Sequence, residues 1–166
     1  MKRWEDRPEE VANLLNPAFC GRLIYSSVQA HQTENDRPMP YTVAFLVLPL
    51  ALHAATREAI IKAIIRHFEV WIDANQEIKI GLAVRARSLV PFARETLAFL
   101  LQTGALEIRE SDAALLIGKR LRQMRGRLFP PSDETKACIR AAGILGKWFA
   151  RVNSPATIYA SLGLMP

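Results

Sequence analysis

The stretch that decides the predicted fold is residues 85–118, RARSLVPFARETLAFLLQTGALEIRESDAALLIG. A proline biases the residue before it away from helical angles, so Pro91 predicts a turn at Ser88–Val90 and a new helix from Pro91 to Thr103. Gly104 is expected to end this helix, and ALEIRE and ALLIG then follow like two strands joined by a turn. Helix, turn, helix and hairpin in this order predict a winged helix-turn-helix.

The helix predicted after Pro91 has one clearly apolar face. Four residues at helical spacing form it: Ala93, Leu97, Leu100 and Leu101. Arg94, Phe92 and Phe99 lie away from that face, and the sequence Pro91-Phe92-Ala93 offers no polar side chain to base edges where a DNA-reading helix begins. Outer aromatic residues more often mark a protein contact or a second layer of core.

Residues 38–56, PMPYTVAFLVLPLALHAAT, contain no Asp, Glu, Lys or Arg. Their length approaches that of a membrane span, but three prolines and a histidine interrupt them. A buried strand at Tyr41–Leu48, followed by a turn at Pro49, fits this pattern better, and we expect no membrane segment.

The residues between this run and the winged region predict helices. Thr56 is expected to cap a helix that begins at Arg57, and the spacing leaves open whether that helix continues to Ala74 or breaks near His67. Asn75 is expected to cap the next helix, whose apolar residues are Ile78, Leu82 and Leu89.

Further helices are predicted on both sides. Glu9–Leu15 is a short helix candidate, and Asn16-Pro17 is a strong start for a helix reaching about Gln32, with Phe19, Leu23, Ile24 and Val28 as its apolar stripe. Ser132 is expected to cap a helix that runs to about Val152, and Ser154-Pro155 to open a last helix that Gly163 closes.

The predicted fold is therefore mainly α (α+β), in one domain over residues 1–166. A winged-helix core with a short β-hairpin wing occupies about residues 41–118, a basic connector residues 119–131, and C-terminal helices residues 132–163. The 166 residues are half apolar and 23% charged, which is typical of a globular protein with its own core.

Charge and cysteine content indicate the compartment. The first residues, MKRWEDRPEEV, carry charge where a signal peptide needs an apolar core. Cys20 and Cys138 lie within helix-like sequence, and we expect both to be reduced, buried thiols of a cytoplasmic protein.

No catalytic constellation is visible in the sequence. His31, His53 and His67 lie at no metal-ligand spacing, and no phosphate-binding glycine loop or nucleophile motif is present. We therefore expect neither an enzyme nor a bound metal or cofactor, although an enzyme with a dispersed site stays an alternative.

Positive charge suggests where nucleic acid could bind, since the net charge is +6. Five cations with no acid between them form the densest field: Lys119, Arg120, Arg122, Arg125 and Arg127. This run predicts either phosphate binding or a solvated face. Arg85 and Arg87 are further candidates for DNA binding, although cations at the end of a helix are also favoured locally.

Four blocks, NPAFCGRLIY, FLVLPLALHAATREAI, GLAVRARSLVPFARETLAFLLQTGALEI and SPATIYASLGLMP, resemble one family in order and spacing. It is the middle component of bacterial three-component ABC-ATPase conflict systems, a group that includes Lamassu-type defence. The resemblance runs from about Glu9 to Pro166.

The resemblance implies a non-enzymatic, winged-helix subunit. Such a subunit lies between an SMC-like ABC ATPase, which engages DNA, and an effector such as a nuclease. No catalytic residues carry over from the family. Its block RAR-x-LVP-x-x-RE falls on residues that we interpret as defining the fold or an interface: Arg85, Arg87, Leu89, Val90, Pro91, Arg94 and Glu95.

Two hypotheses follow for the whole chain. The first is an adaptor that grips its partners through exposed apolar surface at five residues: Phe92, Phe99, Trp148, Phe149 and Tyr159. The alternative is a DNA-binding winged-helix transcriptional regulator that uses the wing and Lys119–Arg127.

Overall fold

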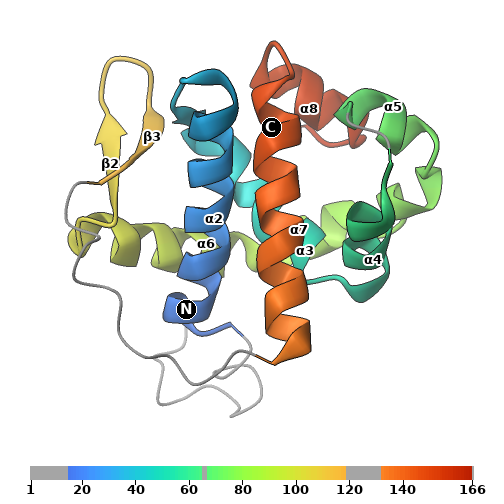
Figure 1. Ribbon diagram of the computed structural model, residues 1–166, viewed down its shortest axis with the longest axis horizontal. Coiled ribbons are helices and arrows are strands. Elements are labelled where there is room, and N and C mark those ends of the chain that lie inside the picture. The colour runs from blue at the N-terminus through green and yellow to red at the C-terminus, as the bar shows by residue number, and fades with distance from the viewer. Residues whose placement is uncertain (1–14, 65–66, 119–131, 166) are drawn as a thin grey trace.

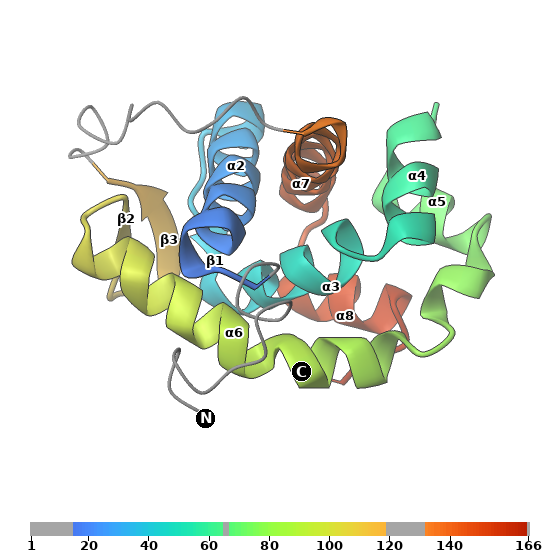
Figure 2. The ribbon, with the colours of Figure 1, turned by 90° about the horizontal axis from the view of Figure 1, so that it is seen from below.

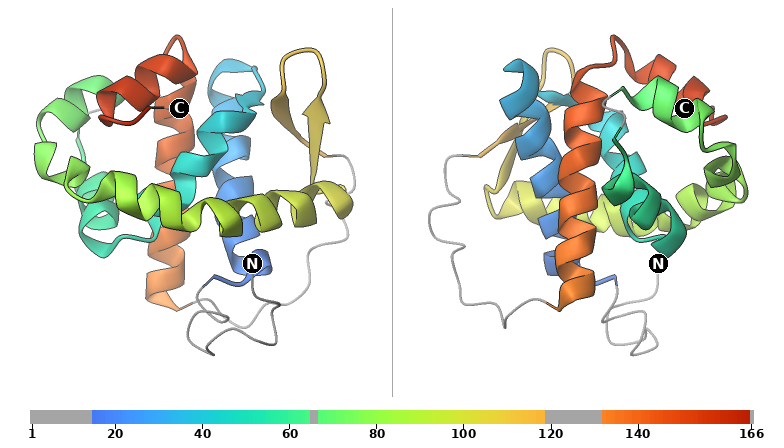
Figure 3. Two further views of the ribbon diagram at one scale, coloured as in Figure 1. Left: turned by 180° about the vertical axis from the view of Figure 1, so that it is seen from behind. Right: turned by 45° about the vertical axis from the view of Figure 1, so that its right-hand side comes forward.

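The computed structural model describes residues 15–64, 67–118 and 132–165. Two long helices, α2 (Pro17–Asn35) and α7 (Asp133–Ala150), stand side by side in the middle of the molecule. Helix α6 (Leu82–Gln102) crosses beneath both of them, as the views from below and from behind show (Figures 2 and 3). A small sheet lies on the α2 side and short helices lie on the α7 side (Figure 1). The fold is thus mainly helical with a small antiparallel sheet, as the sequence predicts at that level.

Helix α2 begins where the sequence predicts. The Asn16 Oδ1 accepts a hydrogen bond from the backbone N–H of Ala18 at 2.8 Å, and Pro17 occupies the first turn. The apolar stripe is also confirmed, because Leu23, Ile24 and Val28 are fully buried. The helix runs three residues past the predicted end at Gln32.

The strand predicted at Tyr41–Leu48 is wrong. A 3₁₀ helix, η2 (Tyr41–Leu46), leads directly into α3 (Val47–Ala51), and only Met39–Pro40 pairs as strand β1. Every residue of α3 is buried. An apolar run that is buried on all sides carries no periodicity, so sequence pattern cannot separate a strand from a helix here.

Helix α4 (Ala54–Lys62) begins before the predicted Thr56 cap, because the His53 side chain is the cap. His53 Nδ1 accepts from the backbone N–H of Thr56 at 3.4 Å. The alternative with a break near His67 is confirmed, since α5 (Phe68–Asp73) starts directly after that residue.

The helix predicted from Asn75 is replaced by a short 3₁₀ helix, η3 (Gln76–Lys79). The Asn75 side chain does not cap it and donates instead to the carbonyl of Trp71 at 2.7 Å. Gly81, with φ of 68°, then turns the chain into α6.

The turn predicted at Ser88–Val90 is absent, because α6 is one continuous helix with Pro91 inside it. Pro91 is exposed, so the backbone hydrogen bond that it cannot make lies on the solvent side, where water can replace it. Long helices also curve with their convex side toward solvent, which accommodates a proline there. The helix-turn-helix predicted at this place is not formed, and a winged-helix core is not confirmed.

The predicted hairpin is confirmed. Strand β2 (Leu106–Arg109) pairs antiparallel with β3 (Ala114–Ile117), and β1 adds to the other side of β3 in the order β1–β3–β2. Gly104, with φ of 67°, separates α6 from β2 as expected. Arg109 and Asp112 form an ion pair of 2.6 Å across the hairpin turn.

Ala113 in this turn has φ of 50°, a left-handed conformation that strains any residue with a Cβ. We expect Ala113→Gly to raise the free energy of unfolding by about 0.5–1 kcal/mol. Urea denaturation checks this, with Ala98→Gly on exposed helix α6 as the control that should lose about 1 kcal/mol. An Ala113→Gly variant less stable than the wild type would contradict the assigned turn.

The N-caps predicted for the two helices at the C-terminal end of the chain are confirmed. Ser132 Oγ accepts from the backbone N–H of Thr135 at 3.1 Å, and Ser154 Oγ accepts from that of Thr157 at 3.2 Å. The second cap opens α8 (Pro155–Ser161), which Gly163 closes with φ of 69°.

Helices α2 and α7 touch backbone to backbone. A Cβ on Gly146 would lie 2.1 Å from the carbonyl oxygen of Ser27, so only glycine fits at this crossing. Where the two helices end, Asn35 Nδ2 donates to the Ala150 carbonyl at 2.7 Å. Glycine thus sets how closely the central pair packs.

Arg57 of α4 links this helix to α3 and α7. Its guanidinium, which is mostly buried, donates to the carbonyls of Ala51 and Leu52 at the end of α3 and to Glu134 at the start of α7. A buried cation with three acceptors is satisfied, so this residue organises the fold.

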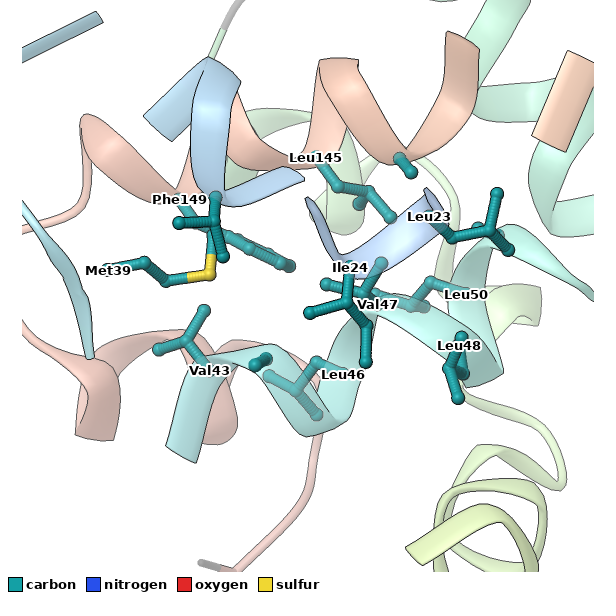
Figure 4. Packing of buried hydrophobic residues seen from close by; sticks show 14 of the residues in the cluster. Leu23, Ile24, Met39, Val43, Leu46, Val47, Leu48, Leu50, Leu145 and Phe149 are labelled. Carbon is teal, nitrogen blue, oxygen red and sulfur yellow. The ribbon is translucent and has the colours of Figure 1, made fainter. Parts of the chain in front are cut away.

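One cluster of buried side chains joins the described elements. Figure 4 shows its middle, where Leu23 and Ile24 of α2 meet Leu145 and Phe149 of α7 above the η2–α3 segment. Strands on the α2 side and short helices on the α7 side contribute to the same cluster, through Leu106 and Leu115 and through Phe68 and Ile158.

No helix in the described ranges is by itself long and apolar enough to cross a membrane. Tyr41–Ala51 and Ala54–Lys62 reach that length only together, and they bend by 102° at the break between them. The predicted basic connector, residues 119–131, and residues 9–14 of the predicted first helix lie outside the described residues.

Candidate protein-interaction surface

The chemistry of the described residues offers little to a reaction. They contain no group of three or more His, Cys, Asp or Glu side chains that could hold a metal ion. Cys20 and Cys138 are buried and free, as predicted. Burial raises the pKa of the Cys20 thiol to about 12 and raises that of Cys138 as well, so neither supplies a thiolate near neutral pH.

A hollow of about 220 Å³ lies where α2 and α7 end, and its polar groups serve the fold. His31 Nδ1 lies 3.1 Å from the carbonyl oxygen of Arg37, and burial lowers the pKa of His31, so this imidazole is neutral and donates from Nδ1. Asn35 Oδ1 accepts from the backbone N–H of Arg37 at 3.0 Å. These contacts hold the loop after α2 in place.

A second hollow, of about 590 Å³, opens beside the C-terminal half of α7. Its walls include Ala63, Ile64, Ile144 and Trp148, and the Arg151–Glu34 ion pair of 2.7 Å lies at the same place. This hollow is open, and its walls combine apolar side chains with the charged side chains of Glu34, Lys147 and Arg151. Such a mixed, open surface suits a protein contact.

Trp148 and Phe149, predicted as exposed grips, are buried with 4% and 1% of their surface accessible. Trp148 packs on Trp71 with ring centroids 4.8 Å apart, and Phe149 meets Phe68 edge to face at 5.2 Å. The prediction that both are exposed is wrong, because the sequence does not show that α5 covers them.

Three other residues predicted as exposed contacts are partly buried: Tyr159, Phe92 and Phe99. Tyr159 is half-buried, and its hydroxyl donates to the carbonyl of Thr42 at 2.9 Å, which ties α8 to η2. Phe99 packs against the core from the flank of α6, which fits a second layer of core, and Phe92 is partly buried on the same helix.

The three arginines predicted as site residues on α6 have different surroundings. The Arg85 guanidinium donates to the carbonyls of Ile80 and Ile78 at 2.9 and 3.2 Å, so it clamps η3 onto the first turn of α6. Arg85 and Arg87 therefore lie near the start of a helix, and the predicted helix end at this place is wrong. Arg87 and Arg94 are exposed and have no ion-pair partner within the described part of the chain.

We expect Arg85→Ala to lower the free energy of unfolding by about 1.5–2 kcal/mol, because two hydrogen bonds from a charged donor are lost. Arg87→Ala, two residues away on the exposed face, should change it by less than about 0.5 kcal/mol. Thermal unfolding of both variants checks this. Equal stability of the two variants would contradict the clamp.

Comparison with known families decides the identity at this point. The model of the family described as ABC-three component (ABC-3C) system Middle Component 3 matches residues 4–166. The chain belongs to this family. No curated protein and no solved structure gave a significant match.

Membership among the ABC-3C middle components confirms the family that the four sequence blocks resemble. It implies that the chain works in an assembly with other components. The candidate site is therefore a surface for partner proteins.

Five residues predicted to contact DNA in this middle component stay untested. Lys119, Arg120, Arg122, Arg125 and Arg127 lie outside the described residues. Phosphate binding by this run stays a prediction based on charge.

Sequence reasoning missed the exposed aliphatic residues of this middle component. Ile80 and Val84 are each 74% accessible, yet the pattern placed them within a predicted helix from Asn75 whose outer face was not considered. Placing the start of α6 after Gly81 would have found Val84 on its outer side and Ile80 just before the helix.

Proposed function

We propose that this middle component is a non-catalytic adaptor in a bacterial defence complex of the cytoplasm, directed against phage or plasmids. In this proposal it links an SMC-like ABC ATPase to an effector such as a nuclease, as in Lamassu-type systems. The observation that carries it is the family match over residues 4–166. Within the described residues, no group of three or more His, Cys, Asp or Glu side chains that could hold a metal ion is found, which is compatible with this proposal.

The mechanism of an adaptor is coupling between states. DNA engaged by the ATPase changes the assembly, and the adaptor holds or releases the effector. Ligand-driven coupling requires different contacts in the two states, so the adaptor must touch at least one partner differently before and after DNA is engaged.

A second candidate is a DNA-binding winged-helix regulator, which the net charge of +6 and the run at residues 119–127 favour. The β2–β3 hairpin could serve as its wing. The arrangement around Pro91 favours the adaptor, because α6 is continuous and offers no separate recognition helix there.

A tagged pull-down from the native host, at moderate salt and with nuclease added, separates these candidates. The adaptor should bring down a coiled-coil ATPase in stoichiometric amount, with or without an effector. A chain that purifies alone and binds DNA with a steep salt dependence would contradict the adaptor and support the regulator.

A further inference from the structure

Among the described elements, helix α6 lies at one edge of the molecule, with α2, α3 and η2 against its core side (Figure 2). Its core side carries the buried residues Leu82, Ala93, Leu97 and Leu100. The opposite side carries exposed residues at intervals of three and four: Val84, Arg87, Pro91, Arg94 and Ala98. These five residues, called the α6 outer stripe, face away from the core because helical positions spaced three and four apart share one side.

The stripe combines exposed aliphatic surface with positive charge. Val84 is 74% accessible, and Ile80, just before the helix, is equally so. Both cations are arginine, and neither has an ion-pair partner among residues 15–64, 67–118 and 132–165.

Its two arginines and its exposed aliphatic side chain suit a protein interface. Arginine is enriched there and lysine depleted, and aliphatic residues gain from burial. A DNA surface would use polar or basic side chains at most positions, since phosphates need donors that Val84, Pro91 and Ala98 do not have.

The geometry points to the shape of the partner. The stripe extends for about 20 Å, given a rise of about 1.5 Å per residue between Val84 and Ala98. Arg87 and Arg94 are two helical turns apart, about 10 Å, and apolar residues lie before, between and after them. An antiparallel or parallel helix with two carboxylates at the same interval matches this pattern.

We propose that the α6 outer stripe binds an acidic amphipathic helix of one of the other components of the ABC-3C system. Arg87 and Arg94 pair with carboxylates of that helix, and Val84 with Pro91 packs against its apolar residues. This inference rests on the proposed adaptor function and names the surface through which one partner is held.

Charge reversal tests it in the complex of full-length components. The chain carrying R87E and R94E together should bind one of the two other components about 100-fold more weakly, a tenfold loss for each charge pair, and bind the other component unchanged. The matched control carries R22E and R140E, two exposed arginines of α2 and α7 with no described ion-pair partner. Both variants change the net charge equally, and the control should bind both components within about threefold of the wild type.

A photo-crosslinking residue at position 84 then identifies the contact. The crosslinked segment should be helical and contain two carboxylates about seven residues apart, and changing these to lysine should restore binding to the R87E and R94E chain. Failure of that rescue, or equal losses in both variants, would overturn the inference.

The outcomes separate this inference from the proposed function. A wild-type chain that binds neither component contradicts both. A wild-type chain that binds both components, and is unaffected by R87E and R94E, contradicts the stripe alone. A loss confined to DNA affinity, measured with a duplex oligonucleotide, would make the stripe a nucleic-acid surface and overturn the inference as well.

Discussion

Gly146→Ala should lower the free energy of unfolding by about 3 kcal/mol and the melting temperature by about 9 °C. The added Cβ would lie 2.1 Å from the Ser27 carbonyl oxygen and 2.9 Å from its carbonyl carbon. Both atoms belong to the backbone of α2, so no side chain can move aside. The central helices must separate, and the packing between them is lost over several turns.

Gly143→Ala is the matched control for this effect. It lies in the same helix, and a Cβ there would meet no atom within 4 Å. Replacing an unhindered helical glycine by alanine should raise the free energy of unfolding by about 0.5–1 kcal/mol. Denaturant unfolding of the two variants should therefore shift in opposite directions. A Gly146→Ala variant as stable as the wild type would contradict the close packing of α2 and α7.

The second large effect is expected for Phe149→Ala, with a loss of about 4 kcal/mol in the free energy of unfolding. The ring is 1% accessible and packs edge to face on Phe68. Truncation leaves a cavity between α7 and α5 that the surrounding rings cannot fill. Thermal unfolding measures the loss directly.

This variant also tests whether Phe149 is a core residue or an exposed residue that contacts a partner. If Phe149 were an exposed contact residue, its truncation would weaken partner binding and leave the melting temperature unchanged. If it is a core residue, its truncation lowers the melting temperature first. Tyr159→Phe is the milder comparison, because it removes only the hydroxyl that donates to the Thr42 carbonyl and should cost about 1 kcal/mol. Unchanged stability of Phe149→Ala would mean that the aromatic cluster does not hold α5 to α7.

Local signals in the sequence predicted several ends of elements, although the caps expected at Thr56 and Asn75 are wrong. Asn16, Ser132 and Ser154 cap the helices that they were expected to cap, and Gly104 and Gly163 end theirs. Each is decided by a hydrogen bond to a residue two or three positions away, or by a backbone angle that favours glycine. The β2–β3 hairpin was predictable for the same reason.

Features decided by distant contacts were not predictable. The η2–α3 segment is an apolar run without helical periodicity, and α3 is buried on all sides, so the sequence pattern predicts a strand. Pro91 predicts the end of a helix. The helix α6 continues through it because the proline is exposed on the solvent side. Burial of Trp148 and Phe149 depends on α5, which lies far away in the sequence.

In the candidate site too, some features were predictable from the sequence and others depend on the three-dimensional structure. The family blocks identified the middle component, and Arg94 was expected at an interface. The hydrogen bonds from Arg85 to the carbonyls of Ile78 and Ile80 depend on the turn at Gly81. The continuous helix predicted from Asn75 left no place for this turn. Arg87 and Arg94 fall on one stripe only because the chain does not turn between them.

The central claim is that this middle component joins the ATPase to the effector, and reconstitution from the three purified components tests it most directly. We would measure the mass of the complexes in solution with ATPase and effector mixed alone, and then with this chain added. The account predicts that ATPase and effector stay separate until the chain is present, and that all three then form one complex of fixed stoichiometry. An ATPase and effector that associate equally well without the chain would contradict it.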